Sequence, residues 1–287
     1  MITKTDMLEL ALDAYIAERD TPYMRLFSAA RYALLRGGKR LRPILSMATA
    51  EAFGVKAESA LSTACALEMI HTYSLIHDDL PCMDNDDFRR GKPSLHKAFD
   101  EATALLAGDF LLTHAFSIIA LDPELTPFQR ISLIQLLASH AGGDGMIGGQ
   151  MMDIEAEGVS INIELLKQIH ALKTGALITA SILSGGIVAN ASKDEMESLH
   201  LFGKDIGLAF QIIDDVVDVI SSEAKHGKKT ASDEANNKST YVSLMGVDKA
   251  KKAAEDLYQR SLTHLDAINR DTTLLKELAK QLVYRNS

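Results

Sequence analysis

Five aspartates lie within ten residues of this chain, in the segment HDDLPCMDNDD at 77–87. Asp78 and Asp79 directly follow an apolar stretch, and adjacent carboxylates repel one another and are costly to bury without a cation. A hard divalent metal is the natural compensation, because Mg²⁺ is typically held by one or two carboxylates together with substrate phosphates. Asp86 and Asp87, further from the apolar stretch, are explained equally well by a solvated acidic loop.

A second acidic group, DDVVD at 214–218, lies inside another apolar segment. Asp214 and Asp218 are four residues apart and share one face of a helix, with Asp215 beside them. Three like charges on an apolar helix destabilise it unless cations bind. The two acidic groups together predict two walls of one metal-binding cavity.

Basic residues occur in GGKRLRP at 37–43 and, directly after the first acidic segment, in FRRGKP at 88–93. Arginine offers phosphate a bidentate fork and lysine a point charge. Lys39 and Arg42 are three residues apart and share a face if the segment is helical. The first basic segment alone fits a solvated turn as well, but carboxylates followed by arginines indicate a site for a metal and a diphosphate.

Three smaller groups accompany these segments. Gln150 and Asp153 share one helical face, and Lys173 and Thr174 precede an uncharged helix. A polar stretch with several lysines, 227–241, follows the second acidic group. Each of these groups, taken separately, indicates surface or capping chemistry rather than a ligand site.

Long helices must position these residues. All six prolines lie at or before position 127, and Ala, Leu, Ile, Met, Lys and Glu dominate the remainder, a composition that favours helices. No Pro/Gly/Ser-rich linker or repeat divides the chain, which predicts one all-α domain, 1–287. We expect helices at 7–20, 24–36, 43–54, 58–77, 101–121, 127–142, 162–188, 193–221 and 247–268.

Two of these segments, 61–76 and 206–220, are apolar on nearly every side, as helices at the centre of a bundle are. Each nevertheless ends in, or contains, paired aspartates. Local rules tend to fail at functional sites. This conflict between a buried setting and ionised groups therefore marks both segments as functional.

The composition excludes several classes of protein. The 287 residues are 47% hydrophobic with a net charge of −9, which argues against disorder and against a nucleic-acid partner. Cys65 and Cys82 make neither a disulfide scaffold nor a zinc site. The charged N-terminal segment is not a signal peptide. Thr174–Ser192 carries no charge, but its Ser, Thr, Gly and Asn fit a buried helix better than a membrane span, so we expect a cytoplasmic protein.

The ordered motifs resemble the trans-isoprenyl diphosphate synthases, most closely the bacterial farnesyl diphosphate synthases. The similar pieces are GGKRLRP, HTYSLIHDDLPCMDNDDFRRGKPSLH, GGQMMD, KTGAL, FQIIDDVVDV and GK…KSTY, which span about 70% of the chain. The resemblance implies an isoprenoid-synthase helical bundle around a deep central cavity, a homodimer, and small-molecule diphosphate substrates. It also implies three Mg²⁺ ions per active site, for which Mn²⁺ can substitute.

The same resemblance assigns roles to individual residues. It gives metal binding to Asp78, Asp79, Asp84, Asp214, Asp215 and Asp218. It assigns the binding of isopentenyl diphosphate to Lys39, Arg42, His71 and Arg90. It assigns the binding of the allylic diphosphate to Arg89, Lys173, Thr174, Gln211, Lys228 and Lys238, with Lys229 as the alternative to Lys228. It also assigns catalytic roles to Lys173, Thr174 and Gln211.

The length of the product depends on how deep the cavity is below the first aspartates. Tyr73 lies five residues before Asp78, and an aromatic residue there resembles the enzymes that stop at the C15 product, farnesyl diphosphate. Helix geometry places Ser74, rather than Tyr73, directly below Asp78. A small residue at this position leaves a C20 product, and so a geranylgeranyl diphosphate synthase, open.

Other functions account for fewer of the motifs. A terpene cyclase or head-to-head condensing enzyme of the same fold has no need of the GGKRLRP segment as a second diphosphate site. A catalytically silent subunit of a heteromeric synthase should have lost motif residues that are present here. A structural or simple metal-binding helical protein leaves the basic segments unexplained.

Overall fold

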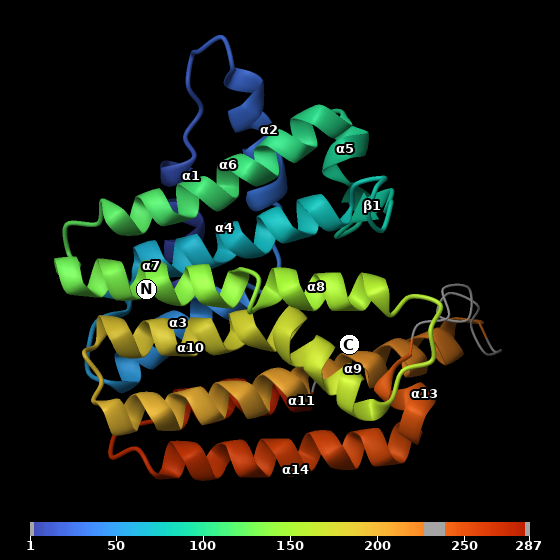
Figure 1. The fold of residues 1–287 in the computed structure, drawn as a ribbon. Coiled ribbons are helices and arrows are strands. Elements are labelled where there is room, and N and C mark those ends of the chain that lie inside the picture. Colours follow the sequence, from blue (N-terminus) through green and yellow to red (C-terminus); the bar gives the residue numbers. More distant parts are fainter. Residues whose placement is uncertain (1–2, 227–238, 285–287) are drawn as a thin grey trace. The chain divides into compact units, whose positions relative to one another are not determined.

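The computed structural model describes residues 3–226 and 239–284, and the chain divides into two compact units, 1–135 and 136–287. The described residues are helical apart from loops and one short hairpin, so the predicted all-α class is confirmed (Figure 1). In that hairpin, β1 (Phe88–Arg89) pairs antiparallel with β2 (Lys92–Pro93). Lys228 and Lys238 lie outside the described residues. That the whole chain forms a single domain stays a prediction.

The first unit is built around one central helix. Helix α4 packs against α6, α3, α1 and α2, and most of its side chains are buried on every side, as the apolar sequence predicts. Asp100 caps α6 by accepting a hydrogen bond from the Thr103 N–H. The elements are α1 (Lys4–Tyr15), α2 (Met24–Leu34), α3 (Leu41–Ala52), η1 (Ala57–Ala60), α4 (Leu61–Asp78), α5 (Leu95–Ala98), α6 (Glu101–Ala120) and α7 (Pro127–Ala141), the last of which crosses the unit boundary.

The second unit contains a buried helix, α10, whose side chains are nearly all inaccessible to solvent. It packs against α11, which in turn packs along α14, the two lying side by side in Figure 1. A π-helical turn, η2, joins α9 to α10. The elements are α8 (Met146–Glu155), α9 (Ile163–His170), η2 (Ala171–Gly175), α10 (Ala176–Val188), α11 (Lys193–His226), α13 (Tyr241–Met245), α14 (Val247–Asp266) and α15 (Thr273–Val283).

Glycines let α11 approach η2 and α10 closely. A Cβ atom on Gly203 would lie 2.9 Å from the Thr179 Cα, and one on Gly207 would lie 3.0 Å from the Gly175 Cα. Both distances are shorter than packed side chains tolerate, so these helices meet backbone to backbone. The contact fixes α11 at Gly207, one turn before Gln211, against the turn that carries Lys173 and Thr174.

The predicted helices are present with shifted ends, and several elements were not predicted. Helix α11 extends to His226 rather than ending at 221, and the predicted 162–188 helix is interrupted by η2. Helices α5, α8, α13 and α15 and the hairpin were missed. Most of these are short, and short elements give weak periodic signals.

Two helical stretches, Glu101–Ala120 and Ile163–Val188, are long and apolar enough to cross a membrane. In Ile163–Val188, 72% of the apolar window is buried inside the protein, as expected for a core helix. In Glu101–Ala120 only 39% is buried, and Leu105 and Leu106 are exposed. Helix α6 (Glu101–Ala120) therefore presents an apolar face that the first unit does not cover.

Candidate active site

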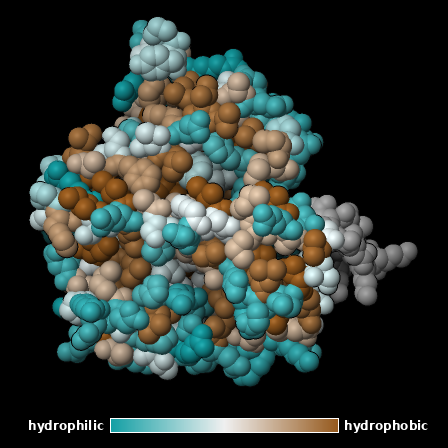
Figure 2. All heavy atoms as spheres, in the orientation of Figure 1, coloured by the Kyte–Doolittle hydropathy of each residue, from teal (hydrophilic) through white to brown (hydrophobic). Residues whose placement is uncertain are grey.

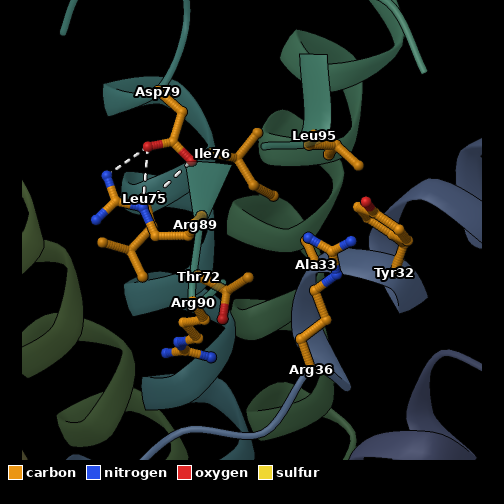
Figure 3. A pocket seen from close by; sticks show the side chains of 10 residues that line it. All are labelled: Tyr32, Ala33, Arg36, Thr72, Leu75, Ile76, Asp79, Arg89, Arg90 and Leu95. Carbon is orange, nitrogen blue, oxygen red and sulfur yellow. Dashed lines mark hydrogen bonds and ion pairs between the residues drawn. The ribbon is translucent and has the colours of Figure 1, made fainter. Parts of the chain in front are cut away.

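The first acidic segment begins where α4 ends. Asp78 is the last residue of α4, and Asp79, which follows it, is buried with 3% of its side chain exposed. A carboxylate at a helix C-terminus is unfavourable because of the helix dipole. Arg89 provides the compensation: its Nε donates to Asp79 Oδ1 and Oδ2 at 2.9 and 3.3 Å, and its Nη2 donates to Oδ1 (Figure 3). Burial raises the pKa of Asp79, and the Arg89 guanidinium opposes that rise.

The other aspartates of this segment are more accessible. Asp78 is half-buried and Asp84 is exposed, and the Asp84 N–H donates to the Asp78 carbonyl at 2.8 Å, which closes the loop. Arg89 also reaches Asp86, at 3.1 Å. Arg89 therefore supplies one compensating cation for Asp79, and the metal role that the sequence predicts for Asp79 stays a prediction.

The GGKRLRP segment is an extended loop followed by a helix. Gly37, Gly38 and Arg40 have positive φ values of 74°, 132° and 46°, and α3 begins only at Leu41. Lys39 is therefore exposed in the loop and does not share a helical face with Arg42, because only Arg42 lies in α3. The helical spacing considered for this pair does not occur.

Positive charge converges on His71. Its pKa lies well below the ordinary value because it is buried and because four guanidiniums, led by Arg42 and Arg90, disfavour a further positive charge. The structure thus places His71, Arg42 and Arg90 in one positively charged region. An anion is the ligand that such a region would attract.

A small cavity of about 30 Å³ adjoins this region, enough for one or two water molecules. Figure 3 shows its lining, in which Asp79 and Arg89 form one side and Arg36 and Tyr32 the other. The Thr72 hydroxyl, which also lines it, is buried and has no hydrogen-bond partner among the residues that the structure covers.

The second acidic group lies on α11. Asp215 is 8% exposed and accepts hydrogen bonds from the Tyr241 N–H at 2.9 Å and from Gln211 Nε2 at 3.4 Å. Burial raises the pKa of Asp215 to about 6, an effect that these two hydrogen bonds oppose and that Asp214 and Asp218 reinforce. Asp214 is half-buried and Asp218 is exposed.

A cavity of about 200 Å³ opens in this unit beside the second acidic group. Its lining brings together five residues to which the resemblance assigned a role, along with residues of α8, α9 and the neighbouring loops. The five are Lys173, Thr174, Gln211, Asp215 and Asp218. These side chains come from the π-turn and from α11, which the glycine contacts hold together. A cation, a hydroxyl, an amide and carboxylates around one cavity can bind a metal diphosphate.

The π-turn gives Lys173 its place. Lys173 Nζ donates to Asp153 Oδ2 on α8 at 2.7 Å, and both side chains are largely buried. Gly149, also on α8, lies so close that a Cβ there would overlap the Lys173 backbone. Isolated π-turns are frequent at functional sites. Here the turn presents both Lys173 and Thr174 to the cavity.

Metal ligands are not gathered into a ready cage. Among residues 3–226 and 239–284, no group of three or more His, Cys, Asp or Glu side chains is placed to hold one ion. This donor set fits Mg²⁺, which takes few protein carboxylates and completes its coordination with phosphate oxygens and water. Of the six aspartates to which the resemblance assigned metal binding, Asp78, Asp84, Asp214 and Asp218 are the accessible ones.

A sequence model of the Polyprenyl synthetase family matches residues 24–277, most of the chain. The chain belongs to the polyprenyl synthetase family. This polyprenyl synthetase is 45% identical to the farnesyl diphosphate synthase of Micrococcus luteus over 98% of its own length and 96% of the relative. It is also 45% identical to the geranylgeranyl diphosphate synthase of Cyanophora paradoxa, over 91% and 88% of the two chains.

A solved structure shares the fold of this polyprenyl synthetase. The apo structure of an FPP/GFPP synthase from Zymomonas mobilis superposes with a TM-score of 0.88 at 40% identity, over 98% of this chain and 96% of that one. The predicted isoprenoid-synthase fold class is therefore confirmed. The predicted central cavity with two metal-binding walls stays a prediction, as do the individual residue roles.

Three residues near the sites of this polyprenyl synthetase received no role from the sequence. Asp153 holds Lys173, His170 lines the 200 Å³ cavity, and the Tyr241 N–H binds Asp215. The spacing of Gln150 and Asp153 was the one available signal, since it placed Asp153 on a helical face. The other two contacts join segments far apart in sequence, and no local pattern indicates them.

Proposed function

We propose that this polyprenyl synthetase condenses isopentenyl diphosphate head-to-tail with dimethylallyl and then geranyl diphosphate, giving (E,E)-farnesyl diphosphate. The cavity that gathers Lys173, Thr174, Gln211, Asp215 and Asp218 carries the proposal. The near full-length similarity to farnesyl diphosphate synthases at 42–45% identity supports the choice of substrates. Both observations concern the same reaction, prenyl transfer.

The first unit supplies the residues for isopentenyl diphosphate. Arg42, His71 and Arg90 lie in one positively charged region, and Lys39 is exposed on the adjoining loop. His71 is neutral at pH 7 because its pKa is lowered, so it offers a hydrogen bond without adding charge. The guanidiniums of Arg42 and Arg90 supply charge-assisted hydrogen bonds to the diphosphate.

The second unit supplies most of the residues for the allylic diphosphate. Lys173 and Thr174 offer a cation and a hydroxyl from the π-turn, and Gln211 an amide from α11. Arg89 and the lysines at 228 and 238 complete the proposed set, with Lys229 as the alternative to Lys228. Arg89 would have to serve the diphosphate while it remains bound to Asp79.

The metal requirement follows from the carboxylates. We assign Mg²⁺ to the aspartates of both acidic segments, with three ions per site and Mn²⁺ as a substitute. Bound Mg²⁺ would neutralise the negative charge that develops on the leaving diphosphate. The residues directed at the diphosphate oxygens add to this: Lys173 with its positive charge, Thr174 with its hydroxyl.

The carbon skeleton needs a different environment. Ionisation of the allylic C–O bond leaves a carbocation that water would quench, so the reacting carbons must be kept dry. Ile212, Ile213 and Val216, which surround the aspartates on α11, are buried and apolar. Isopentenyl diphosphate attacks through its double bond, and a proton leaves. The released diphosphate is the acceptor we assign to that proton, and the Gln211 carbonyl oxygen steadies the cation.

Tyr73 and Ser74 are the proposed determinants of product length. Tyr73 is 4% exposed, and its ring packs edge-on against His77 at 5.6 Å. Ser74 is half-buried and its hydroxyl donates to the His71 carbonyl at 2.9 Å. A buried, packed aromatic is the better barrier to a growing chain. The smaller Ser74 and the geranylgeranyl diphosphate synthases among the relatives keep a C20 product as the second candidate.

We further propose that the enzyme is a cytoplasmic homodimer. Apolar side chains are exposed on α6 and α7 (Leu105, Leu106, Phe128 and Ile131), where Figure 2 shows apolar surface. On α8, Ile147, Met151 and Ile154 recur at helical spacing and are 49, 52 and 38% exposed. Exposed apolar surface of this kind marks an interface, and a second copy of the chain is the partner we assign to it.

Sedimentation equilibrium tests the dimer. Leu106→Glu combined with Phe128→Glu should shift the protein towards monomer, because each change places a charge in the proposed interface. Leu10→Glu is the control, since Leu10 is 65% exposed on α1, away from these helices in sequence. A dimer unaffected by the first pair would contradict the assignment of these surfaces.

Product analysis tests the reaction. The purified protein is incubated with Mg²⁺, isopentenyl diphosphate and, separately, dimethylallyl, geranyl or farnesyl diphosphate. A C15 product that is not extended supports farnesyl diphosphate synthesis, whereas C20 from the farnesyl primer reassigns the enzyme to geranylgeranyl diphosphate. No product from any primer would reject the proposed function and favour a silent subunit.

Tyr73→Ala tests the barrier within the same assay. Removing the buried ring deepens the space below Asp78, so we expect products longer than C15. Ser74→Ala is the matched control, because it removes a hydroxyl and adds little depth. An unchanged C15 product from Tyr73→Ala would exclude Tyr73 as the determinant.

A further inference from the structure

The middle arginine of GGKRLRP is buried. The Arg40 side chain is fully inaccessible to solvent, and its backbone has a positive φ of 46°. Its Nε donates to Glu9 Oε1 at 2.7 Å, its Nη1 to Glu68 Oε1 at 2.6 Å, and its Nη2 to the Leu34 carbonyl at 2.8 Å. The guanidinium of Arg40 therefore donates these three hydrogen bonds inside the protein, whereas the neighbouring Lys39 is exposed to solvent.

The glutamate that receives Arg40 also lies near a proposed substrate-binding residue. Glu68 is 2% exposed, and the oxygen that binds Arg40 is 3.9 Å from Nη2 of Arg90. At that distance the carboxylate attracts the positive charge of Arg90, but the two groups form no hydrogen bond. A movement of about 1 Å would convert this long ion pair into a hydrogen-bonded one.

The loop glycines hold Arg90 at its present distance. Nη1 of Arg90 donates to the Gly37 carbonyl, and a Cβ on Gly38 would lie 2.8 Å from the Arg90 Cζ. The guanidinium thus lies against the bare backbone of the loop. Its pKa is lowered, because burial and the positive charge of Arg40 outweigh the attraction of Glu68. Arg90 is a cation whose charge the protein only partly compensates, as a residue that binds an anion should be.

We propose that Arg40 is a positioning residue that occupies Glu68 and so keeps Arg90 available to the diphosphate of isopentenyl diphosphate. The inference rests on the proposed function, in which Arg90 binds that substrate. A buried carboxylate without a partner is strongly disfavoured. If Arg40 is removed, Glu68 takes Arg90 as its partner, and the substrate loses a charge-assisted hydrogen bond.

Kinetics of single and double variants of the full-length enzyme test this competition. Arg40→Gln should raise the KM for isopentenyl diphosphate roughly 10- to 100-fold, the value of one charge-assisted hydrogen bond. The KM for geranyl diphosphate should change less than about twofold, since Arg90 is not assigned to the allylic substrate. Adding Glu68→Gln should reverse most of the effect, because the neutral amide no longer captures Arg90.

Arg31→Gln is the matched control. Arg31 is also in the first unit and binds Asp13 at 2.5 Å and the Ile16 carbonyl at 3.2 Å, and none of the partners described for it contacts Arg90. Its loss should leave both KM values unchanged. If Arg40→Gln raises both KM values equally, or if Glu68→Gln fails to restore the KM for isopentenyl diphosphate, Arg40 is merely structural and the inference is rejected.

Glu68→Gln alone keeps the test decisive if Arg40→Gln does not fold. The amide oxygen still accepts from Arg40, and Glu9 and Leu34 hold the remaining donors, so this variant should fold. The competition predicts an unchanged or lower KM for isopentenyl diphosphate, whereas a raised KM would show that Glu68 helps Arg90 and would reject the inference. Wild-type product formation separately reports whether the proposed function itself holds.

Discussion

Each of the two acidic segments contains a buried aspartate whose negative charge must be compensated, and the two segments compensate it with different groups. In each, the second aspartate of the adjacent pair is the buried one: Asp79 in the first unit and Asp215 in the second. Asp79 is bound by the cation of Arg89, whereas Asp215 is bound by the neutral Tyr241 N–H and Gln211 amide. Neutral donors compensate a carboxylate less than a guanidinium does, and the pKa of Asp215 is raised to about 6.

The difference separates two kinds of aspartate within each segment. The buried one is anchored by the protein, while Asp78, Asp84, Asp214 and Asp218 are half-buried or exposed. We therefore expect the accessible aspartates to contribute most to metal binding. The anchored ones fix the backbone from which the others extend, Asp79 through the β-hairpin that carries Arg89 and Asp215 through the start of α13.

The largest effects should come from the accessible aspartates. Asp78→Asn and Asp214→Asn should each lower kcat by about 100- to 1000-fold, the usual cost of losing one preorganised group that stabilises developing charge. Each variant should also need more Mg²⁺ for half-maximal rate. Steady-state kinetics with Mg²⁺ titration measure both effects, and Asp87→Asn, which loses an exposed partner of Lys97, should stay near wild type. A normal Mg²⁺ requirement in Asp214→Asn would contradict the metal role.

The anchors themselves should differ in their contribution to stability. Arg89→Gln leaves Asp79 buried without its cation and should reduce the free energy of unfolding by about 3 kcal/mol. Gln211→Met removes a long, neutral hydrogen bond and should cost about 1 kcal/mol or less. Urea unfolding in EDTA at pH 7 measures both without competition from metal. Equal losses would mean that charge compensation does not distinguish the two segments.

The sequence predicted one of these arrangements far better than the other. The resemblance to the trans-isoprenyl diphosphate synthases singled out Lys173, Thr174 and Gln211, which line one cavity in the structure. Residue type and helical spacing alone indicated only surface or capping chemistry for Lys173 and Thr174. They could not reveal that Arg89 binds Asp79, because that pairing depends on a two-residue turn at Arg90 and Gly91, both with positive φ. Such a turn is typical of tight hairpins, but the flanking strands are too short to give a pattern.

The basic segment shows the same limit. Lys39, Arg40 and Arg42 are all basic residues of the same short segment. The resemblance assigned substrate binding to Lys39 and Arg42 but not to Arg40. That Arg40 is buried follows from a positive φ and from glutamates 31 and 28 residues away in sequence. Long, apolar, proline-free stretches specify helices locally, whereas the partner of a given charge is decided by tertiary packing.

Steric contacts beside the two segments offer a further comparison. A Cβ on Gly149 would overlap the backbone of Lys173, while one on Gly108 would overlap only the imidazole of His77. Gly149→Ala should therefore destabilise the protein by about 3 kcal/mol and Gly108→Ala by about 1 kcal/mol, the two ends of the range for overpacking, because a side chain can turn away and a helix backbone cannot. Thermal unfolding measures the difference, and the reverse order would mean that the π-turn is less rigid than its packing indicates.

Acid should act on the second cavity through His170. Burial and Lys173, opposed by Asp153, lower the pKa of His170 from 6.5 to about 4, and its Nδ1 is buried with no hydrogen-bond partner among the residues described. Between these two pKa values the unfolded chain binds a proton that the folded protein does not. The contribution of His170 to stability is therefore present above pH 6.5 and declines as the pH falls towards 4.

His170→Phe isolates this contribution from the other titrating groups. Phenylalanine retains a ring beside Tyr241, which His170 now approaches at 5.5 Å, and cannot be protonated. Urea unfolding at each pH measures the difference in free energy of unfolding between the variant and wild type. As the pH is lowered from 7 to 4.5, this difference should grow by about 2 kcal/mol in favour of the variant, because only wild type must keep His170 unprotonated. Asp215 titrates in both proteins and cancels in the difference, so a constant gap between the two would show that His170 is free to take up a proton in the folded state.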